Sequence, residues 1–392
     1  MSEQTQALTS AAAARGSLAM EAISVSKDFR IGRHQTLHAV RDVSFNLYRG
    51  AVVALVGESG SGKSTAARLL AGQESLTSGV IQLDGKQVKV ASRGDFRRYK
   101  SQVQLVFQDP FSSLNPVHTV RYHLERPVKL HQGKDVHVDT EVAALMEQVR
   151  LTPAKQFLTK YPHELSGGQR QRVSFARALA AKPSVLLADE PVSMLDVSIR
   201  LEMLSLLDDL RQRFKLALLY ITHDIASARY FADEVLVMYA GEIVERGPAE
   251  EVTQQPAHPY TQLLVASAPD PDNLGSTLRS TTHRTSARDT SGRQASGGAQ
   301  KTGDAAAAGC PFSPRCPLAD EHCFAEDPAL IQISATRGAA CWHLDLAAPE
   351  LIARQPDNGR TNPSAPIRNP SANLPPYPTR EKDENDEEIA QL

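Results

Sequence analysis

The chain has 392 residues, 41% of them hydrophobic and 22% charged, which suits one large or two ordinary domains and excludes a disulfide-stapled miniprotein. Its formal net charge of −2 disfavours a protein that mainly wraps nucleic acid. The longest apolar runs are far shorter than the roughly 20 residues that cross a bilayer, and residues 1–20 lack a secretory signal pattern, so we expect a cytosolic globular protein.

Residues 21–268 alternate short apolar runs with helical stretches. Near-continuous apolar runs predict strands buried on both faces, and they lie at residues 51–56, 103–107, 184–188, 216–221 and 234–240. Ser166 is a candidate N-cap for a helix that places Val173, Ala176 and Leu179 on one face and ends before Pro183. This alternation predicts an α/β domain built on a parallel sheet.

The remaining segments differ in composition. Residues 1–20 are expected to be a flexible N-terminus. Residues 269–308 are rich in Ser, Thr, Gly and Ala and predict a flexible linker, because they cannot bury enough apolar surface to offset their ordering entropy. Residues 309–347 form a small Cys- and Pro-rich extension, and residues 348–392 predict a disordered acidic tail whose charge serves solvation.

The strand expected at 51–56 runs directly into a P-loop pattern and a helix. The candidate phosphate-binding residues are Gly57, Ser59, Gly60, Ser61, Gly62, Lys63, Ser64 and Thr65. Glycines let successive N–H groups point at one phosphate beside a helix N-terminus. Lys63 can reach the β- and γ-phosphates, and Ser64 can offer its hydroxyl to Mg²⁺. The alternative, a Gly/Ser turn without a ligand, is disfavoured by the strand–loop–helix setting.

A second apolar strand ends in Asp189 and Glu190, at the sheet edge where ligands of open α/β sheets bind. We expect Asp189 to hold the Mg²⁺ shell and Glu190 to act as general base on the attacking water. A helix-capping acidic pair is the alternative, which the P-loop makes less favourable.

Residues 165–172, LSGGQRQR, resemble the signature motif of ATP-binding-cassette (ABC) ATPases. The resemblance covers about residues 21–266 and implies an ABC-type nucleotide-binding domain with a helical subdomain at about 110–182. It further implies that ATP lies between the P-loop of one domain and the signature helix of a second ATPase domain, from an identical or related chain. The signature residues concerned are Ser166, Gly167, Gly168 and Gln169.

The same resemblance assigns roles to isolated residues. It implies that Gln108 touches Mg²⁺ or water, that Asp196 belongs to the D-loop, and that His223 hydrogen-bonds the γ-phosphate. Phe29 is the candidate for stacking on adenine, with a core phenylalanine as the alternative. Met194 stands where the D-loop often carries a small residue, which affects local packing only.

Residues 107–116 (FQDPFSSLNP), residues 161–172 (YPHELSGGQRQR) and the extension resemble the ATPase subunits of oligopeptide/dipeptide importers. This resemblance implies peptide uptake through two integral membrane permease subunits and an extracytoplasmic solute-binding protein. It places the chain peripherally on the cytoplasmic face of the inner membrane, with no nucleic acid partner. A soluble ABC ATPase acting on ribosomes or nucleic acid is the alternative, and a P-loop kinase leaves the signature motif unexplained.

The four cysteines, Cys310, Cys316, Cys323 and Cys341, all lie in the extension. Four thiolates can close a zinc site or hold a [4Fe–4S] cluster. The importer resemblance favours the [4Fe–4S] cluster, while zinc and unliganded cysteines stay open. Residues 309–347 carry few large apolar side chains, so we expect the cluster to hold the segment folded.

Overall fold

The computed structural model describes residues 16–32, 35–89, 92–109, 113–133, 135–268 and 309–353. Its centre is an eight-stranded sheet with strand order β11-β12-β10-β9-β3-β8-β7-β6. The neighbours from β9 to β6 are parallel, which confirms the predicted parallel sheet. The five predicted strands are all present, within one residue at each end, as β3 (Val52–Val56), β6 (Val103–Val106), β7 (Val185–Asp189), β8 (Ala217–Thr222) and β9 (Glu234–Tyr239).

A second, antiparallel sheet of order β2-β1-β4-β5 covers one face of the central sheet. Its strands are β1 (Leu18–Ile31), β2 (Gln35–Tyr48), β4 (Ser78–Leu83) and β5 (Lys86–Gln87). Alternate residues of β3 serve two cores: Val53 and Leu55 pack with the antiparallel sheet and α2 (Lys63–Leu70), whereas Val52, Ala54 and Val56 pack with the helices opposite. Both faces of β3 are therefore buried, as its unbroken apolar sequence requires.

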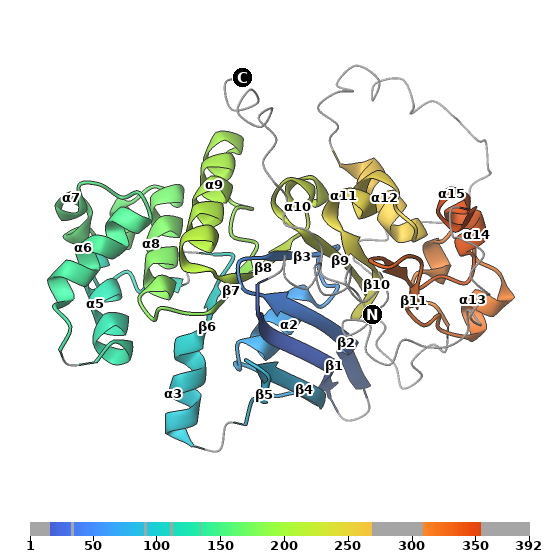
Figure 1. The fold of residues 1–392 in the computed structure, drawn as a ribbon, viewed down its shortest axis with the longest axis horizontal. Coiled ribbons are helices and arrows are strands. Elements are labelled where there is room, and N and C mark those ends of the chain that lie inside the picture. The colour runs from blue at the N-terminus through green and yellow to red at the C-terminus, as the bar shows by residue number, and fades with distance from the viewer. Residues whose placement is uncertain are drawn as a thin grey trace, which may run out of the picture.

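The remaining cassette helices include α5 to α8, which gather at one end of the molecule (Figure 1). In chain order the cassette helices are α3 (Arg93–Gln102), α5 (Val120–His131), α6 (Val138–Gln148), α7 (Ala154–Leu158), η1 (Pro162–Glu164), α8 (Gly167–Leu179), α9 (Val197–Phe214), α10 (Ile225–Phe231), α11 (Ala249–Gln254) and α12 (Pro259–Ser267). Helix α8 confirms its prediction: Ser166 is the N-cap, and Val173, Ala176 and Leu179 are buried.

The C-terminal extension continues the central sheet at the opposite end (Figure 1). Strand β10 (Glu242–Pro248) pairs with β12 (Gly338–Ala339), which pairs in turn with β11 (Ile331–Gln332). Short helices surround these strands: η3 (Ser313–Arg315), α13 (Glu321–Ala325), α14 (Leu344–Ala347) and α15 (Pro349–Ala353). The extension is thus built onto the cassette by backbone pairing.

Apolar packing and a buried ion pair reinforce this junction. Phe312 and Cys310 join the main cassette core, and Ala257 of the cassette packs with Ile333 and Ala339 of the extension. Arg337 Nη2 lies 2.8 Å from Glu245 Oε1, and both side chains are almost fully buried. Residues 309–347 were predicted to have too few large apolar side chains for a core of their own, and the structure shows that they also pack against the core of the cassette.

Two predicted boundaries differ from the structure. Strand β1 begins at Leu18, inside the predicted flexible N-terminus, because Ala19 and Met20 are buried in the sheet. Helix α15 lies inside the predicted disordered tail, where Leu351 and Ile352 pack on the small extension core. Residues 1–15, the predicted linker at 269–308 and the tail from 354 lie outside the described residues.

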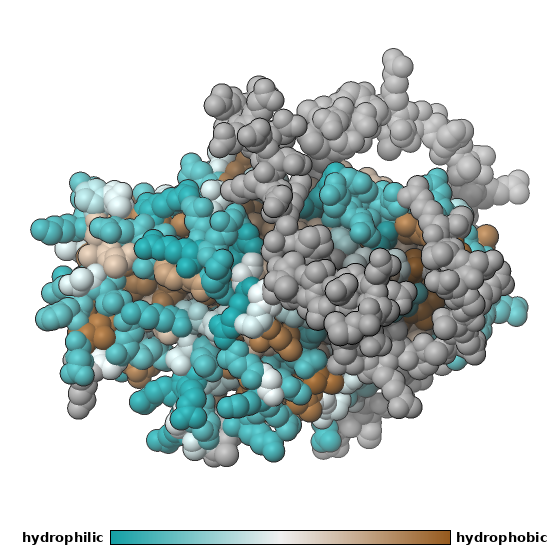
Figure 2. Space-filling view, in the orientation of Figure 1, coloured by the Kyte–Doolittle hydropathy of each residue, from teal (hydrophilic) through white to brown (hydrophobic). Residues whose placement is uncertain are grey.

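The described helices contain none that is long and apolar enough to cross a membrane. The face seen in Figure 2 is mainly hydrophilic over its coloured part, with small separated hydrophobic patches. The buried apolar side chains gather in the two cores between the sheets and helices.

Candidate functional site

The predicted P-loop leaves the C-terminal end of β3 and enters α2, and two of its glycines are sterically required. A Cβ atom on Gly57 would meet the Met238 carbonyl oxygen at 2.2 Å, and one on Gly62 would meet the Ala39 carbonyl oxygen at 2.3 Å. Gly62 also has φ +105°, a conformation that favours glycine. These glycines let the loop turn tightly at the N-terminus of α2, where free N–H groups attract anions.

The ammonium group of Lys63 lies inside this loop. Its Nζ donates hydrogen bonds to the carbonyl oxygens of Gly57 (2.7 Å) and Glu58 (2.8 Å). Burial lowers the pKa of Lys63, while the nearby carboxylates of Glu190, Asp189 and Glu58 oppose that shift. A triphosphate bound here would add the negative charge that a buried ammonium favours.

Two of the three predicted Mg²⁺ ligands, Ser64 and Asp189, are neighbours, while the third, Gln108, contacts Glu190. Ser64 Oγ lies 3.1 Å from Asp189 Oδ1, although 125 positions separate them in the sequence. Burial raises the pKa of Asp189, and the hydrogen bond from Ser64 opposes this shift. A hydroxyl and a partly buried carboxylate side by side form a donor set that suits Mg²⁺, a cation that prefers oxygen ligands.

Glu190 is the centre of a second group of predicted residues. Gln108 Nε2 donates to Glu190 Oε2 at 2.8 Å, and His223 Nδ1 lies 3.3 Å from the same oxygen. Glu190 adopts φ +45°, a left-handed conformation that costs about 1–3 kcal/mol for such a residue. Its backbone N–H donates to Ile221 O, which holds the strained residue between β7 and β8. The four residues predicted to be catalytic therefore lie together. Gln108 and His223 contact Glu190, and the Glu190 carboxylate is close enough to Lys63 to favour its charged form.

The signature residues lie at the N-terminus of α8. Ser166 Oγ accepts from Gln169 N, and Gln169 Oε1 accepts from Ser166 N at 3.1 Å, which forms a capping box. The Ser166 hydroxyl proton is not used in that box. A Cβ atom on Gly168 would lie 2.9 Å from Ile199 of α9, so the glycine permits close helix packing, and Gly167 precedes it in the first turn. No described hydrogen bond joins these residues to the P-loop of the same chain.

The other predicted site residues are more dispersed. Ser61 is buried beside Lys63, Ser59 and Gly60 are exposed, and Thr65 lies in the first turn of α2. Asp196 is the N-cap residue of α9 and makes no side-chain capping bond. Phe29 lies on β1, half-buried, with Lys27 Nζ 4.9 Å from its ring centroid. No described ring contact brings Phe29 to the P-loop, so adenine stacking stays a prediction.

The structure adds two residues that the sequence pattern missed. Arg315 of the extension forms two 2.9 Å bonds to the Glu58 carboxylate, and the Tyr260 hydroxyl accepts from Glu58 N at 2.8 Å. A sequence separation of 257 positions between Arg315 and Glu58 leaves no local signal for this pairing.

The four cysteines of the extension lie close enough to affect one another. Burial is the main cause that raises the pKa of Cys310 to about 11 and that of Cys341 to about 12, and the charges of the other three thiols contribute to the Cys341 value. Cys310 N donates to Cys323 O at 2.8 Å, which joins two of the cysteine-bearing segments directly. Raised thiol pKa values mean that a bound metal would release protons on binding.

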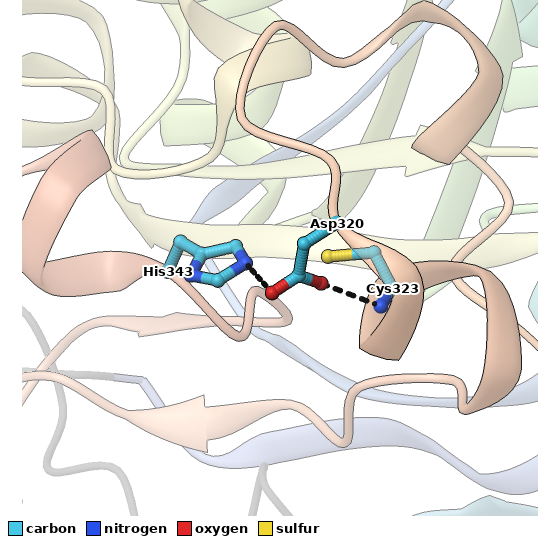
Figure 3. A group of neighbouring side chains, drawn as sticks. All are labelled: Asp320, Cys323 and His343. Atoms are coloured by element: carbon cyan, nitrogen blue, oxygen red, sulfur yellow. Dashed lines mark hydrogen bonds and ion pairs between the residues drawn. The ribbon is translucent and has the colours of Figure 1, made fainter.

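A different trio, Asp320, Cys323 and His343, places its potential ligand atoms within 4.8 Å of one another (Figure 3). Asp320 Oδ1 accepts from Cys323 N at 3.0 Å as the N-cap of α13, and its other oxygen lies 3.1 Å from His343 Nε2. The cap and the ion pair account for this geometry without a metal ion.

Comparison with known proteins matches both parts of the chain. Residues 40–193 match the family described as ABC transporter, and residues 244–323 match the oligopeptide/dipeptide transporter C-terminal region. The chain is 40% identical over 315 residues to the di/tripeptide transport ATP-binding protein DppF of Pseudomonas aeruginosa, covering 80% of this chain and 92% of DppF. It is also 40% identical over 306 residues to a probable peptide ABC transporter ATP-binding protein of Sinorhizobium fredii, covering 78% and 82%.

Solved structures agree with the fold. The chain superposes with a TM-score of 0.55 and 26% identity on cbiO1 from Clostridium perfringens, part of the ABC transporter complex cbiONQ, over 61% of this chain and 91% of cbiO1. It superposes with a TM-score of 0.53 and 26% identity on the dimeric ABC transporter cassette MJ0796, over 59% of this chain and 99% of that cassette. The site geometry, the relatives and the fold lead to one conclusion: the chain belongs to the ATP-hydrolysing, ATP-binding subunits of ABC transporters, in the group that carries the oligopeptide/dipeptide transporter C-terminal region.

Proposed function

We propose that this ATPase subunit drives the uptake of peptides or similar solutes through separate integral membrane permease subunits. The observation that carries the proposal is the pairing of an ABC ATP site with the oligopeptide/dipeptide extension in one folded unit. The printed names of the relatives support a peptide substrate class, because they include peptide and di/tripeptide transport proteins. The complex would also contain an extracytoplasmic solute-binding protein and would hold this chain at the cytoplasmic face of the membrane.

Hydrolysis follows from the arrangement around β3 and β7. Lys63 would face the β- and γ-phosphates, while Ser64 and Asp189 would hold the Mg²⁺ that offsets phosphate charge. Glu190 would accept the proton of the attacking water, and its bonds to Gln108 and His223 orient the carboxylate for that role. His223 is exposed enough to reach a γ-phosphate directly.

A second ATPase domain would complete each site. The Ser166 end of α8 offers helix N–H groups and a hydroxyl proton, yet the P-loop of its own chain already supplies a phosphate site. Leu195 and Ile199 lie against Gly167 and Gly168 at this helix end, and their sequence neighbours Met194, Val197 and Leu201 are more than half exposed. An apolar surface beside an unused phosphate-binding helix end supports a dimer in which Ser166 and its neighbours bind the partner's ATP.

A groove between the central sheet and the helical subdomain is our candidate surface for the permease. It encloses about 360 Å³ and is lined by Phe107 of the segment before Gln108, by Tyr122 and Leu130 of α5, and by Arg126 and Arg177. Apolar walls with basic rims suit a short amphipathic helix carrying acidic residues. Its position beside Gln108 would link docking to the Glu190 group.

We further propose that Cys310, Cys316, Cys323 and Cys341 hold a [4Fe–4S] cluster with a structural role. The charges of neighbouring thiols contribute to the raised pKa values of Cys310, Cys323 and Cys341, which supports a shared site. The backbone bond from Cys310 N to Cys323 O joins two of the cysteine-bearing segments and also supports a shared site.

Copurification tests the transport proposal. The tagged full-length chain, solubilised from its native membrane, should bring down integral membrane proteins. Copurification with ribosomes or DNA instead would contradict the proposal and favour a soluble ABC ATPase that acts on ribosomes or nucleic acid.

Mixing tests the shared site. Chains with Lys63→Ala and chains with Ser166→Arg should be inactive alone and should regain activity when mixed dimers form. Mixed dimers as inactive as the separate variants would contradict a composite site.

Metal analysis tests the cluster. Anaerobically purified protein should contain about four irons and about four acid-labile sulfides per chain. Stoichiometric zinc without iron, or no metal, would contradict it.

A further inference from the structure

The extension reaches the phosphate-binding loop through one side chain. Arg315, the last residue of η3, places Nη1 2.9 Å from Glu58 Oε2 and Nη2 2.9 Å from Glu58 Oε1. Two parallel bonds of this length form the bidentate fork that makes arginine–carboxylate pairs specific. The fork connects the extension to the second residue of the P-loop.

Aromatic rings hold Arg315 in this position. The guanidinium carbon lies 5.6 Å from the Phe312 ring centroid and 5.9 Å from that of Tyr239, and these two rings pack edge to face. Tyr260 packs on both rings, and its hydroxyl accepts from Glu58 N at 2.8 Å. Phe312 is 2% exposed, so the platform under Arg315 is part of the core. A side chain fixed in this way loses little further entropy when it pairs.

Glu58 stands where an unpaired negative charge would be harmful to ATP binding. Its own carbonyl oxygen accepts from Lys63 Nζ at 2.8 Å, and its carboxylate is close enough to influence the Lys63 ammonium. A carboxylate this close to the triphosphate site repels the incoming phosphate charges unless a cation offsets it. Arg315 supplies that cation from a segment more than two hundred residues away in the sequence.

We propose that Arg315 is a positioning residue for ATP binding, which acts by neutralising the Glu58 carboxylate at the P-loop. Both side chains are partly exposed, at 42% and 39%, so water screens the pair and its effect on affinity is modest. The extension therefore contributes directly to the affinity of the ATP site, in addition to its structural role.

Titration calorimetry of MgATP with the full-length chain tests this proposal. Arg315→Ala should raise the Kd for MgATP by about threefold to fivefold, the range expected for one well-formed exposed pair. Arg315→Lys should recover most of the affinity because it restores the charge. Arg49→Ala, which breaks a comparable 2.6 Å ion pair with Asp84 on the antiparallel sheet, is the matched control and should leave the Kd unchanged.

A second background separates neutralisation from simple loss of structure. Glu58→Gln/Arg315→Ala protein lacks both charges of the pair and so has the same local net charge as the wild type, and its Kd for MgATP should return to near the wild-type value. Fluorescence of Trp342, the single tryptophan, which lies in the extension, should stay at its wild-type value in every variant. An unchanged Kd in Arg315→Ala protein would overturn the proposal. So would a double variant whose Kd is as high as that of Arg315→Ala alone, because removing the Glu58 charge would then not compensate for the loss of the Arg315 charge.

Discussion

Replacing Arg337 by methionine should destabilise the whole protein, because Arg337 is the side-chain cation that pairs with the fully buried carboxylate of Glu245. Arg337 Nη2 lies 2.8 Å from Glu245 Oε1 and also donates to Gln255 O at 2.6 Å. Burial raises the pKa of Glu245, while the Ala257 and His258 N–H groups and the Arg337 charge oppose this shift. In the variant the two backbone bonds remain but the charge has no partner. Breaking one side of a buried pair costs about 3–5 kcal/mol.

Urea unfolding provides the assay, with two signals. Trp342 fluorescence reports on the extension, and far-ultraviolet circular dichroism reports mainly on the cassette helices. Because β10 and β12 belong to one sheet, both signals should change at the same urea concentration and should shift together in Arg337→Met protein. The double variant Glu245→Gln/Arg337→Met should recover much of the loss, since it leaves no buried charge. A double variant no more stable than Arg337→Met alone would refute the electrostatic reasoning, and separate transitions in the wild type would refute the single folding unit.

Three further predictions concern the ATP site and its surroundings. Glu190→Gln should bind MgATP normally but hydrolyse it at least about 10²-fold more slowly in the assembled complex, and near-normal turnover would remove Glu190 as general base. Asp189→Asn should raise the Mg²⁺ concentration needed for half-maximal ATPase activity, and an unchanged Mg²⁺ requirement would contradict its role beside Ser64. Burial lowers the pKa of His258 to about 4. Between about pH 6.5 and 4 the unfolded chain therefore binds a proton on His258 that the folded chain does not. The free energy of unfolding should fall by about 1.4 kcal/mol per pH unit as the pH drops through that window. His258→Asn keeps an acceptor for Tyr260 N and should flatten this pH dependence in urea titrations. If the variant shows an equally steep pH dependence, a group other than His258 causes it.

Local sequence patterns predicted the parts of the fold that depend on local chemistry. The apolar runs of the parallel strands demand burial on both faces, and Ser166 with its glycines specifies the start of α8. The P-loop and the acidic pair at the end of β7 were predicted for the same reason, since a phosphate site requires those residue types at fixed spacing. The structure then joins Ser64 to Asp189 and Gln108 to Glu190 as that chemistry requires.

Contacts between distant segments could not be predicted in this way. Arg315 with Glu58 and Arg337 with Glu245 pair across 257 and 92 positions, and no periodicity links such residues. The apolar content of residues 309–347 was too small to predict a core, because part of its packing comes from the cassette: Ala257 joins the small extension core, and Phe312 packs into the main cassette core. The strained backbone of Glu190 was equally hidden, since it depends on the packing of β7 against β8.

Peptide uptake measured in cells is the most direct test of the proposed function. Cells lacking this chain are supplied either with the wild-type protein or with Glu190→Gln protein at equal abundance in the membrane fraction, and the accumulation of labelled di- and tripeptides is followed. We predict that the wild type restores ATP-dependent accumulation and that Glu190→Gln does not. Equal accumulation with both proteins, or none with the wild type for any peptide tested, would contradict a peptide importer driven by this ATP site.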